Sequence, residues 1–106
     1  MTWTVETLSE TVDEEIAALP PRVQAKVLWI VEQIEERGLP ALRPPHLDHL
    51  GDGLYELRAK GQEGIGRALF VTRGQRVIVL HVFQKKTQKT PARAIALARK
   101  RARDVT

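Results

Sequence analysis

The side chains best suited to chemistry are cations in the C-terminal half of the chain. Four of them stand on, or directly after, segments with the pattern of β-strands: Arg58, Lys60, Arg67 and Lys85. An arginine guanidinium can hold a phosphate through two parallel hydrogen bonds, and a lysine ammonium supplies a compact positive charge. Cations repeated in this way indicate a protein that binds the phosphate groups of a polyanion.

Charge is divided unevenly along the chain. Residues 1–53 hold four Lys or Arg and ten Asp or Glu, a net −6, whereas residues 54–106 hold thirteen and three, a net +10. Together these halves give the overall charge of +4. A basic half concentrates polyanions around it, and nucleic acid is the commonest polyanion in the cytoplasm. We therefore expect a nucleic-acid partner, with solubility alone as the simpler explanation.

Several other kinds of site find little support. The chain has no cysteine, which excludes thiol catalysis and a cysteine-based zinc site. Its only serine, Ser9, stands at a predicted helix start, so a serine hydrolase has no credible nucleophile. The pair His46 and His49 lies in a proline-rich segment without companion ligands, which is weak evidence for a metal site. The glycine-rich stretch 61–66 opens no helix, so it is a hairpin connection and not a nucleotide-binding loop. We expect no metal and no cofactor.

The N-terminal half is predicted to be mainly helical. Residues 2–6 are expected to form a short strand, and a first helix begins at Ser9 or Thr11. A second helix runs from Pro21 to Arg37, with apolar residues at helical spacing along one side. Residues 39–53 are rich in proline and glycine and are expected to form an irregular connector.

The C-terminal half is predicted to form an antiparallel meander and a helix. Its strands are Leu54–Lys60, Ile65–Thr72 and Arg76–Phe83, the last two joined by a tight turn. Residues 84–90 are a polar joint, and Thr90-Pro91 starts the final helix as N-cap and first-turn proline. The fold class is thus α+β, a single domain over residues 1–106 with an antiparallel sheet, two N-terminal helices and a C-terminal helix.

Alternation along the first strand of the meander separates its side chains onto two faces. One face receives the apolar set and the other the charged set: Tyr55, Leu57 and Ala59 against Glu56, Arg58 and Lys60. We expect the apolar set to enter the core. The charged set, joined by Arg67 from the next strand, is expected on an exposed face of the sheet.

The sequence carries no signal for export or membrane insertion. The N-terminus lacks a basic region followed by an apolar run, and no apolar stretch approaches the ~18 residues of a spanning helix. The lack of cysteine gives no sign of an oxidising compartment. We expect a cytoplasmic protein without membrane contact.

Aromatic residues are few, at 5% of the chain. Trp29 flanks the apolar stripe of the second predicted helix, and Trp3 lies in the short first strand, so both are expected to pack against the core. So few rings argue against a protein that reads nucleic acid by stacking on its bases.

Two motifs resemble those of a known protein family. The segment Leu54-Tyr55-Glu56-Leu57-Arg58 is followed by Arg67 and then by residues 80–91, LHVFQKKTQKTP. In order and spacing they resemble the RelE/HigB toxin superfamily, above all its phage-derived HigB-like branch, whose members carry L-[YW]-E-L-R and L-H-x-F-x-K-K-T-x-K-T-P. The resemblance covers essentially the whole chain, although the N-terminal helices match only in pattern. It implies a small RelE-like fold.

The resemblance also implies an activity. Toxins of this superfamily are endoribonucleases that cleave messenger RNA, often on the ribosome and without a metal, by attack of a 2′-hydroxyl on the adjacent phosphate. On that basis Arg58 and Arg67 are predicted to hold the scissile phosphate, and fixed cations stabilise the charge of the transition state. The whole predicted catalytic set is Arg58, Lys60, Arg67, Lys85 and His81. The predicted flanking RNA contacts are Lys86, Lys89, Arg73 and Arg76.

The residue that transfers protons is left open. Lys60 and Lys85 rank above His81, because crowding by other cations can lower the pKa of a lysine. His81 stands between two apolar residues, where a buried, hydrogen-bonded histidine is more common than a catalytic one. Glu56 is a further candidate by its strand position.

The resemblance implies messenger RNA, the ribosome and a cognate antitoxin as partners, the antitoxin being expected as a small helix-turn-helix protein. The alternative is a non-catalytic or ParE-like toxin that binds gyrase or the ribosome without cleaving RNA, and fold alone does not separate the two. A sequence-specific DNA regulator ranks last, because the second predicted helix is acidic outside its apolar stripe.

Overall fold

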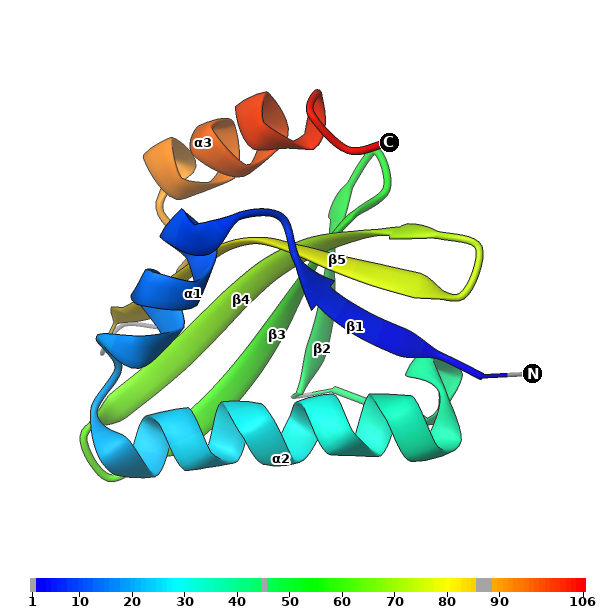
Figure 1. Cartoon of the computed structure of the whole chain (residues 1–106). Coiled ribbons are helices and arrows are strands. Elements are labelled where there is room, and N and C mark those ends of the chain that lie inside the picture. The colour runs from blue at the N-terminus through cyan, green and yellow to red at the C-terminus, as the bar shows by residue number, and fades with distance from the viewer. Residues whose placement is uncertain (1, 45, 86–88) are drawn as a thin grey trace.

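Figure 1 shows the computed structural model of the chain, which describes residues 2–44, 46–85 and 89–106. Three helices, a short 3-10 turn (η1) and five strands succeed one another as β1 (Thr4–Thr7), α1 (Glu10–Ala17), α2 (Pro21–Arg37), η1 (Leu39–Ala41), β2 (Leu47–Gly51), β3 (Leu54–Gly61), β4 (Gly64–Arg73), β5 (Arg76–Lys85) and α3 (Ala92–Ala102). The predicted α+β class is confirmed. Within the described ranges, no helix is long and apolar enough to cross a membrane.

The strands form one sheet in the order β1-β5-β4-β3-β2. Strands β2 to β5 pair antiparallel, as predicted for the meander. Strand β1 adds a parallel edge, with Thr4 opposite Arg76 and Thr7 opposite Val79. Parallel neighbours need a long crossover, and here everything from α1 to β4 lies between the two strands. The sheet is therefore mostly antiparallel.

Strand β2 lies inside the segment that was predicted to be irregular, so that prediction was wrong for residues 47–51. The strand exists because it pairs with β3, Leu47 lying opposite Leu57. A turn of two residues, Asp52 and Gly53, joins the two strands, and both of them and Gly51 at the end of β2 have positive φ. Strand formation here depends on a neighbour, and proline-rich flanks conceal it in the sequence.

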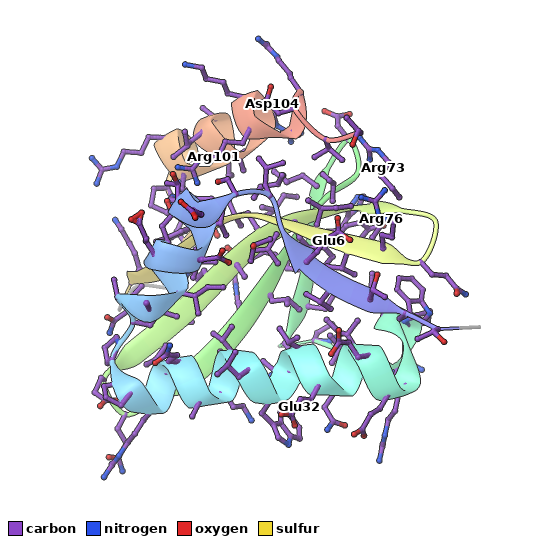
Figure 2. All side chains as sticks on the ribbon, viewed as in Figure 1. Glu6, Glu32, Arg73, Arg76, Arg101 and Asp104 are labelled. Atoms are coloured by element: carbon purple, nitrogen blue, oxygen red, sulfur yellow. The ribbon has the colours of Figure 1, made fainter. Side chains whose placement is uncertain are left out.

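Helices cover the sheet on both faces (Figure 1). Helices α1 and α2 pack on one face, where the apolar stripe of α2 is buried as predicted: Val23, Val27, Ile30 and Ile34. The outer side of α2 carries both signs of charge, with Arg22 and Lys26 toward its start and Glu32 and Glu36 toward its end, and Figure 2 shows Glu32 pointing away from the sheet. Helix α3 packs on the opposite face through Ala94 and Ala98, against Leu69 and Leu80.

Candidate functional site

Strand pairing brings the predicted cations to one end of the face that α3 partly covers. Opposed residues on β3, β4 and β5 form three rows across the sheet, which we call rungs. In that strand order, the outer rung is Lys60, Ile65 and Lys85, and the next two are Arg58, Arg67 and Phe83, and Glu56, Leu69 and His81. Opposed residues in such rungs are about 5 Å apart and diagonal ones about 7–8 Å. The five residues of the predicted catalytic set therefore lie on three adjacent strands, within three neighbouring rungs.

Arg67 is fully buried, which corrects the expectation that it lies on an exposed face. Its Nη1 donates a hydrogen bond to Thr90 Oγ1 at 3.1 Å and lies 3.8 Å from Glu56 Oε2. Burial lowers the pKa of Arg67, Glu56 opposes this effect and Arg58 adds to it. The guanidinium nevertheless stays charged, because no protein environment brings an arginine near neutrality.

Thr90 contributes to the cover over Arg67. It was predicted to be the N-cap of the last helix, but that position is taken by Pro91 and the helix starts at Ala92. The Thr90 hydroxyl instead accepts from Arg67 and donates to Glu56 Oε2. The strand pattern correctly predicted the face of Arg67, whereas its burial depends on a residue that precedes α3.

Glu56 is the centre of this buried polar cluster. Its carboxylate is fully buried, and Oε1 accepts a 2.6 Å hydrogen bond from Arg58 Nε while Oε2 faces Arg67 and Thr90. Arg58 also lies 3.7 Å from Asp48 on β2 and stays partly exposed, at 24% of its side chain. Both carboxylate oxygens of Glu56 are engaged, so its geometry is that of a counter-ion and not of a free general base.

The other cations at this end of the sheet have different surroundings. Lys60, Lys89 and Arg93 are exposed and Lys85 is half-buried. Within the described part of the chain, none of these four forms an ion pair. Their charges face solvent without a carboxylate to neutralise them. The predicted RNA contact Lys86 lies outside the described residues.

An open hollow of about 430 Å³ lies between the end of β5 and the start of α3. We call it the β5–α3 hollow, and its lining includes His81, Phe83, Lys85, Pro91, Arg93 and Leu97. The His81 and Phe83 rings are stacked, with centroids 5.0 Å apart and planes at 26°. The hollow directly adjoins the rung that contains Arg67.

His81 is tied to the other face of the molecule through Glu15 of α1. Its Nδ1 lies 3.0 Å from Glu15 Oε1, which also accepts the Val82 amide at 2.9 Å. Arg101 of α3, labelled in Figure 2, donates to both Glu15 oxygens and to the Leu80 carbonyl. The hydrogen bonding anticipated for His81 is present, although its side chain is 15% exposed and not fully buried. Its partner Glu15, 66 residues away, carried no signal in the sequence.

The charge of Glu15 is stabilised by these neighbours. Burial would raise its pKa, but the Val82 amide, His81 and Arg101 outweigh burial, so the pKa lies below the usual value of 4.5. Because Glu15 is ionised, a proton on His81 Nδ1 provides the donor of the 3.0 Å contact to Glu15 Oε1, and we place a ring proton there.

Arg73 and Arg76 lie at the other end of the sheet, in the β4–β5 hairpin. At about 3.4 Å per residue, Arg73 is roughly 20 Å along β4 from Arg67. Arg76 Nη2 donates to Glu6 at 2.8 Å, a pair visible in Figure 2, and Arg73 donates to the Thr72 carbonyl at 2.8 Å. The hydrogen bond from Arg76 lowers the pKa of Glu6. The structure does not bring these two arginines to the rest of the predicted site.

His46 and His49 do not converge on a common point. His46 Nδ1 lies 3.4 Å from the Arg58 carbonyl, and the His49 ring contacts Tyr55 with centroids 4.8 Å apart. Throughout the residues that the structure describes, no group of three or more His, Cys, Asp or Glu side chains could hold a metal ion.

The solved structures that share this fold include three RelE proteins. A double arginine-to-alanine mutant of the E. coli toxin RelE in the free state has a TM-score of 0.68 at 14% identity, covering 95% of this chain and 98% of that one. The toxin–antitoxin complex RelBE2 of Mycobacterium tuberculosis has a TM-score of 0.56 at 23% identity, and the match covers 80% of this chain and 100% of that one. The archaeal RelE-RelB complex of Pyrococcus horikoshii OT3 has a TM-score of 0.56 at 17% identity, and the match covers 84% of this chain and 100% of that one. The predicted RelE-like fold is confirmed.

Sequence comparison gives the family. None of the curated proteins matches the chain. Residues 14–103 match a family model described as phage-derived protein Gp49-like (DUF891). That match spans most of the chain, from α1 to the end of α3. The protein therefore belongs to the phage-derived Gp49-like family, in agreement with the predicted phage-derived branch, and its fold is that of the RelE toxins.

Proposed function

We propose that this protein is the toxin of a type II toxin–antitoxin system and an endoribonuclease that cleaves messenger RNA without a metal. The observation that supports this best is the group of cations at one end of the sheet, Lys60, Lys85, Lys89 and Arg93, which have no ion-pair partner among the described residues. Cations that protein carboxylates do not neutralise remain available to phosphates.

In the proposed reaction the 2′-hydroxyl oxygen attacks the adjacent phosphorus and the bond to the 5′ oxygen breaks. The products are a 2′,3′-cyclic phosphate and a 5′-hydroxyl, so one proton leaves the attacking oxygen and one reaches the leaving oxygen. Arg58, Lys60 and Lys85 supply fixed positive charge for the phosphate oxygens. Arg67 lies beneath them and, in this conformation, adds its charge from below without touching RNA.

Proton transfer is assigned to the titratable groups of the three rungs. Lys60 and Lys85 belong to the outer rung, and His81 belongs to the innermost of the three rungs. Glu56 is the weakest candidate, because Arg58, Arg67 and Thr90 occupy its carboxylate. Single substitutions of the first three residues, compared by the pH dependence of cleavage, separate their roles.

The proposed partners are messenger RNA, the ribosome and an antitoxin encoded beside the toxin, all in the cytoplasm. Two of the structures with this fold are complexes of RelE with RelB, which supports an antitoxin here. The competing function is a ParE-like or ribosome-binding toxin that does not cleave RNA.

The test is induction in cells, with growth and new 5′ ends in messenger RNA as readouts. We compare wild type with the double variant Lys60→Gln and Lys85→Gln, and use Arg73→Gln with Arg76→Gln as a control of equal charge change. We expect growth arrest and cleavage of messenger RNA with wild type and with the control variant. The lysine variant should show neither. Arrest without new RNA ends would favour the non-cleaving alternative. Cleavage that survives the lysine variant would mean that the site lies elsewhere.

A further inference from the structure

The β5–α3 hollow combines an apolar lining with two cations. His81, Phe83 and Leu97 contribute apolar surface, and Lys85 and Arg93 are the charged members of its lining. Pockets that enclose small molecules have volumes of about 300–1,000 Å³. At about 430 Å³, this open hollow is large enough for one flat heterocycle with its sugar.

The ring pair in the hollow is held from behind. Glu15 fixes Nδ1 of His81, and Arg101 and the Val82 amide fix Glu15. Phe83 is stacked on the His81 ring and lies opposite Arg67 in the sheet. Because these contacts hold the platform formed by the His81 and Phe83 rings in place without a ligand, stacking an aromatic ligand on it costs little conformational entropy.

The hollow is continuous with the proposed phosphate site. Neighbouring strands are about 4.8 Å apart, so Phe83 is one strand from Arg67 and two from Arg58. Lys85 belongs to both places, since it lines the hollow and ends the outer rung. Lys85 and Arg93 have no ion pair with any residue that the structure describes. An apolar slot beside such cations suits a nucleotide, which joins a flat base to an anionic phosphate.

We propose that the β5–α3 hollow is a base-binding subsite for single-stranded RNA. One base stacks against the Phe83 ring, and Lys85 and Arg93 hold the phosphates on either side of it. The inference rests on the proposed function for the identity of the ligand as RNA. Stacking accepts all four bases, so the subsite positions the strand and supplies affinity without selecting a base. This proposal departs from the expectation that a chain with few aromatic residues does not stack on bases.

The probe is a fluorescein-labelled hexanucleotide with 2′-O-methyl groups, which can bind but cannot be cleaved. Its affinity for the full chain is measured by anisotropy, with an abasic sugar placed at each position in turn. We expect one abasic position to weaken binding by about ten- to a hundredfold, as loss of one stacked base does. Phe83→Leu keeps an apolar side chain in place, and should weaken binding of the intact probe while becoming insensitive to that abasic position.

Three results would overturn the subsite. Either all abasic positions weaken binding alike, or Phe83→Leu binds the probe as wild type does while Lys85→Gln does not. Weakening of an antitoxin complex by Phe83→Leu, with RNA binding unchanged, would assign the hollow to a protein partner and also overturn it. The cleavage assay is separate. Abasic sensitivity without cleavage supports the subsite and refutes the nuclease, and cleavage without this sensitivity does the reverse.

Discussion

The two ends of the central sheet both carry basic side chains, but these side chains differ in what they contact. At the β4–β5 hairpin, Arg76 is paired with Glu6 and Arg73 with a backbone carbonyl. At the opposite end, Lys60 and Lys85 form no ion pair within the described residues. Under the proposed function, the cations that bind RNA are those that lack a carboxylate partner in the protein, and not every basic side chain of the sheet.

The end of the sheet that carries Lys60 and Lys85 also differs from the hairpin end in its buried residues. Glu56, Arg67 and Thr90 form a buried cluster there, and Arg58 joins it from the surface. Removing charges from water is costly, so such a cluster is stable only when each charge keeps its partner. The hairpin end has an exposed ion pair instead.

The largest effect is expected from Glu56→Ala. This change leaves the buried Arg67 guanidinium without its carboxylate, and breaking a buried pair in this way costs about 3–5 kcal/mol of unfolding free energy. Urea denaturation followed by circular dichroism measures the loss. Glu6→Ala serves as the control, because its carboxylate is exposed and its pairing contributes little.

If Glu56→Ala and Glu6→Ala have the same stability, the two ends of the sheet do not differ below the surface. A variant that is too unstable to purify would still agree with the expectation. In that case Glu56→Gln, which keeps the shape and one acceptor oxygen, provides the measurable comparison.

The next effect concerns RNA affinity. Lys60→Gln with Lys85→Gln should weaken binding of the uncleavable hexanucleotide and reduce its salt dependence. Each phosphate contact on a single strand adds about 0.7 to the slope of log affinity against log salt, so the slope should fall by about 1.4. Anisotropy titrations at several salt concentrations measure it.

The matched control is Arg73→Gln with Arg76→Gln, which removes the same charge at the hairpin end. An equal fall in slope for both double variants would mean that RNA binds the whole basic surface. The difference in ion pairing between the two ends of the sheet would then have no effect on RNA binding.

Much of the fold was predictable because it depends on local pattern. The apolar stripe and flanking residues placed α2 at Pro21 to Arg37, which are its observed bounds. Alternation and the Arg73-Gly74-Gln75 turn placed β4 and β5 to within two residues of their observed ends. These signals lie within one element, so the sequence alone reveals them.

The rest depends on residues that are distant along the chain. Thr90 meets Glu56 across 34 residues and Glu15 meets His81 across 66. No period within a strand or helix encodes such contacts. Alternation therefore predicted that Arg58 and Arg67 share a face, but it did not predict that Arg67 is covered or that Phe83 lines a hollow.

A smaller effect is expected from Glu15→Gln and concerns pH. The pKa of Glu15 is lowered in the folded chain, so its stabilisation is complete above the usual value of 4.5 and is lost as pH falls through the folded value. The melting temperature of wild type should thus fall more steeply below pH 4.5 than that of Glu15→Gln. The control is Glu14→Gln, an exposed neighbour on the same helix.

Identical pH profiles for Glu14→Gln and Glu15→Gln would show that the contacts to His81 and Arg101 do not stabilise the folded chain. The platform proposed for the hollow would then lack its support from α1. A profile for Glu14→Gln that follows wild type, together with a flatter one for Glu15→Gln, is the result we expect.

The smallest expected effect tests whether a cation without an ion-pair partner is sufficient for RNA binding. Glu6→Gln releases Arg76 from its ion pair and creates at the hairpin end the unpaired state found at the other end. Affinity for the hexanucleotide should rise by about twofold or less, because the released charge lies more than a Debye length of about 10 Å from the hollow. The abasic position that weakens binding should stay the same. If that position changes, RNA has been drawn to Arg76, and the ring pair contributes less to binding than the cations do.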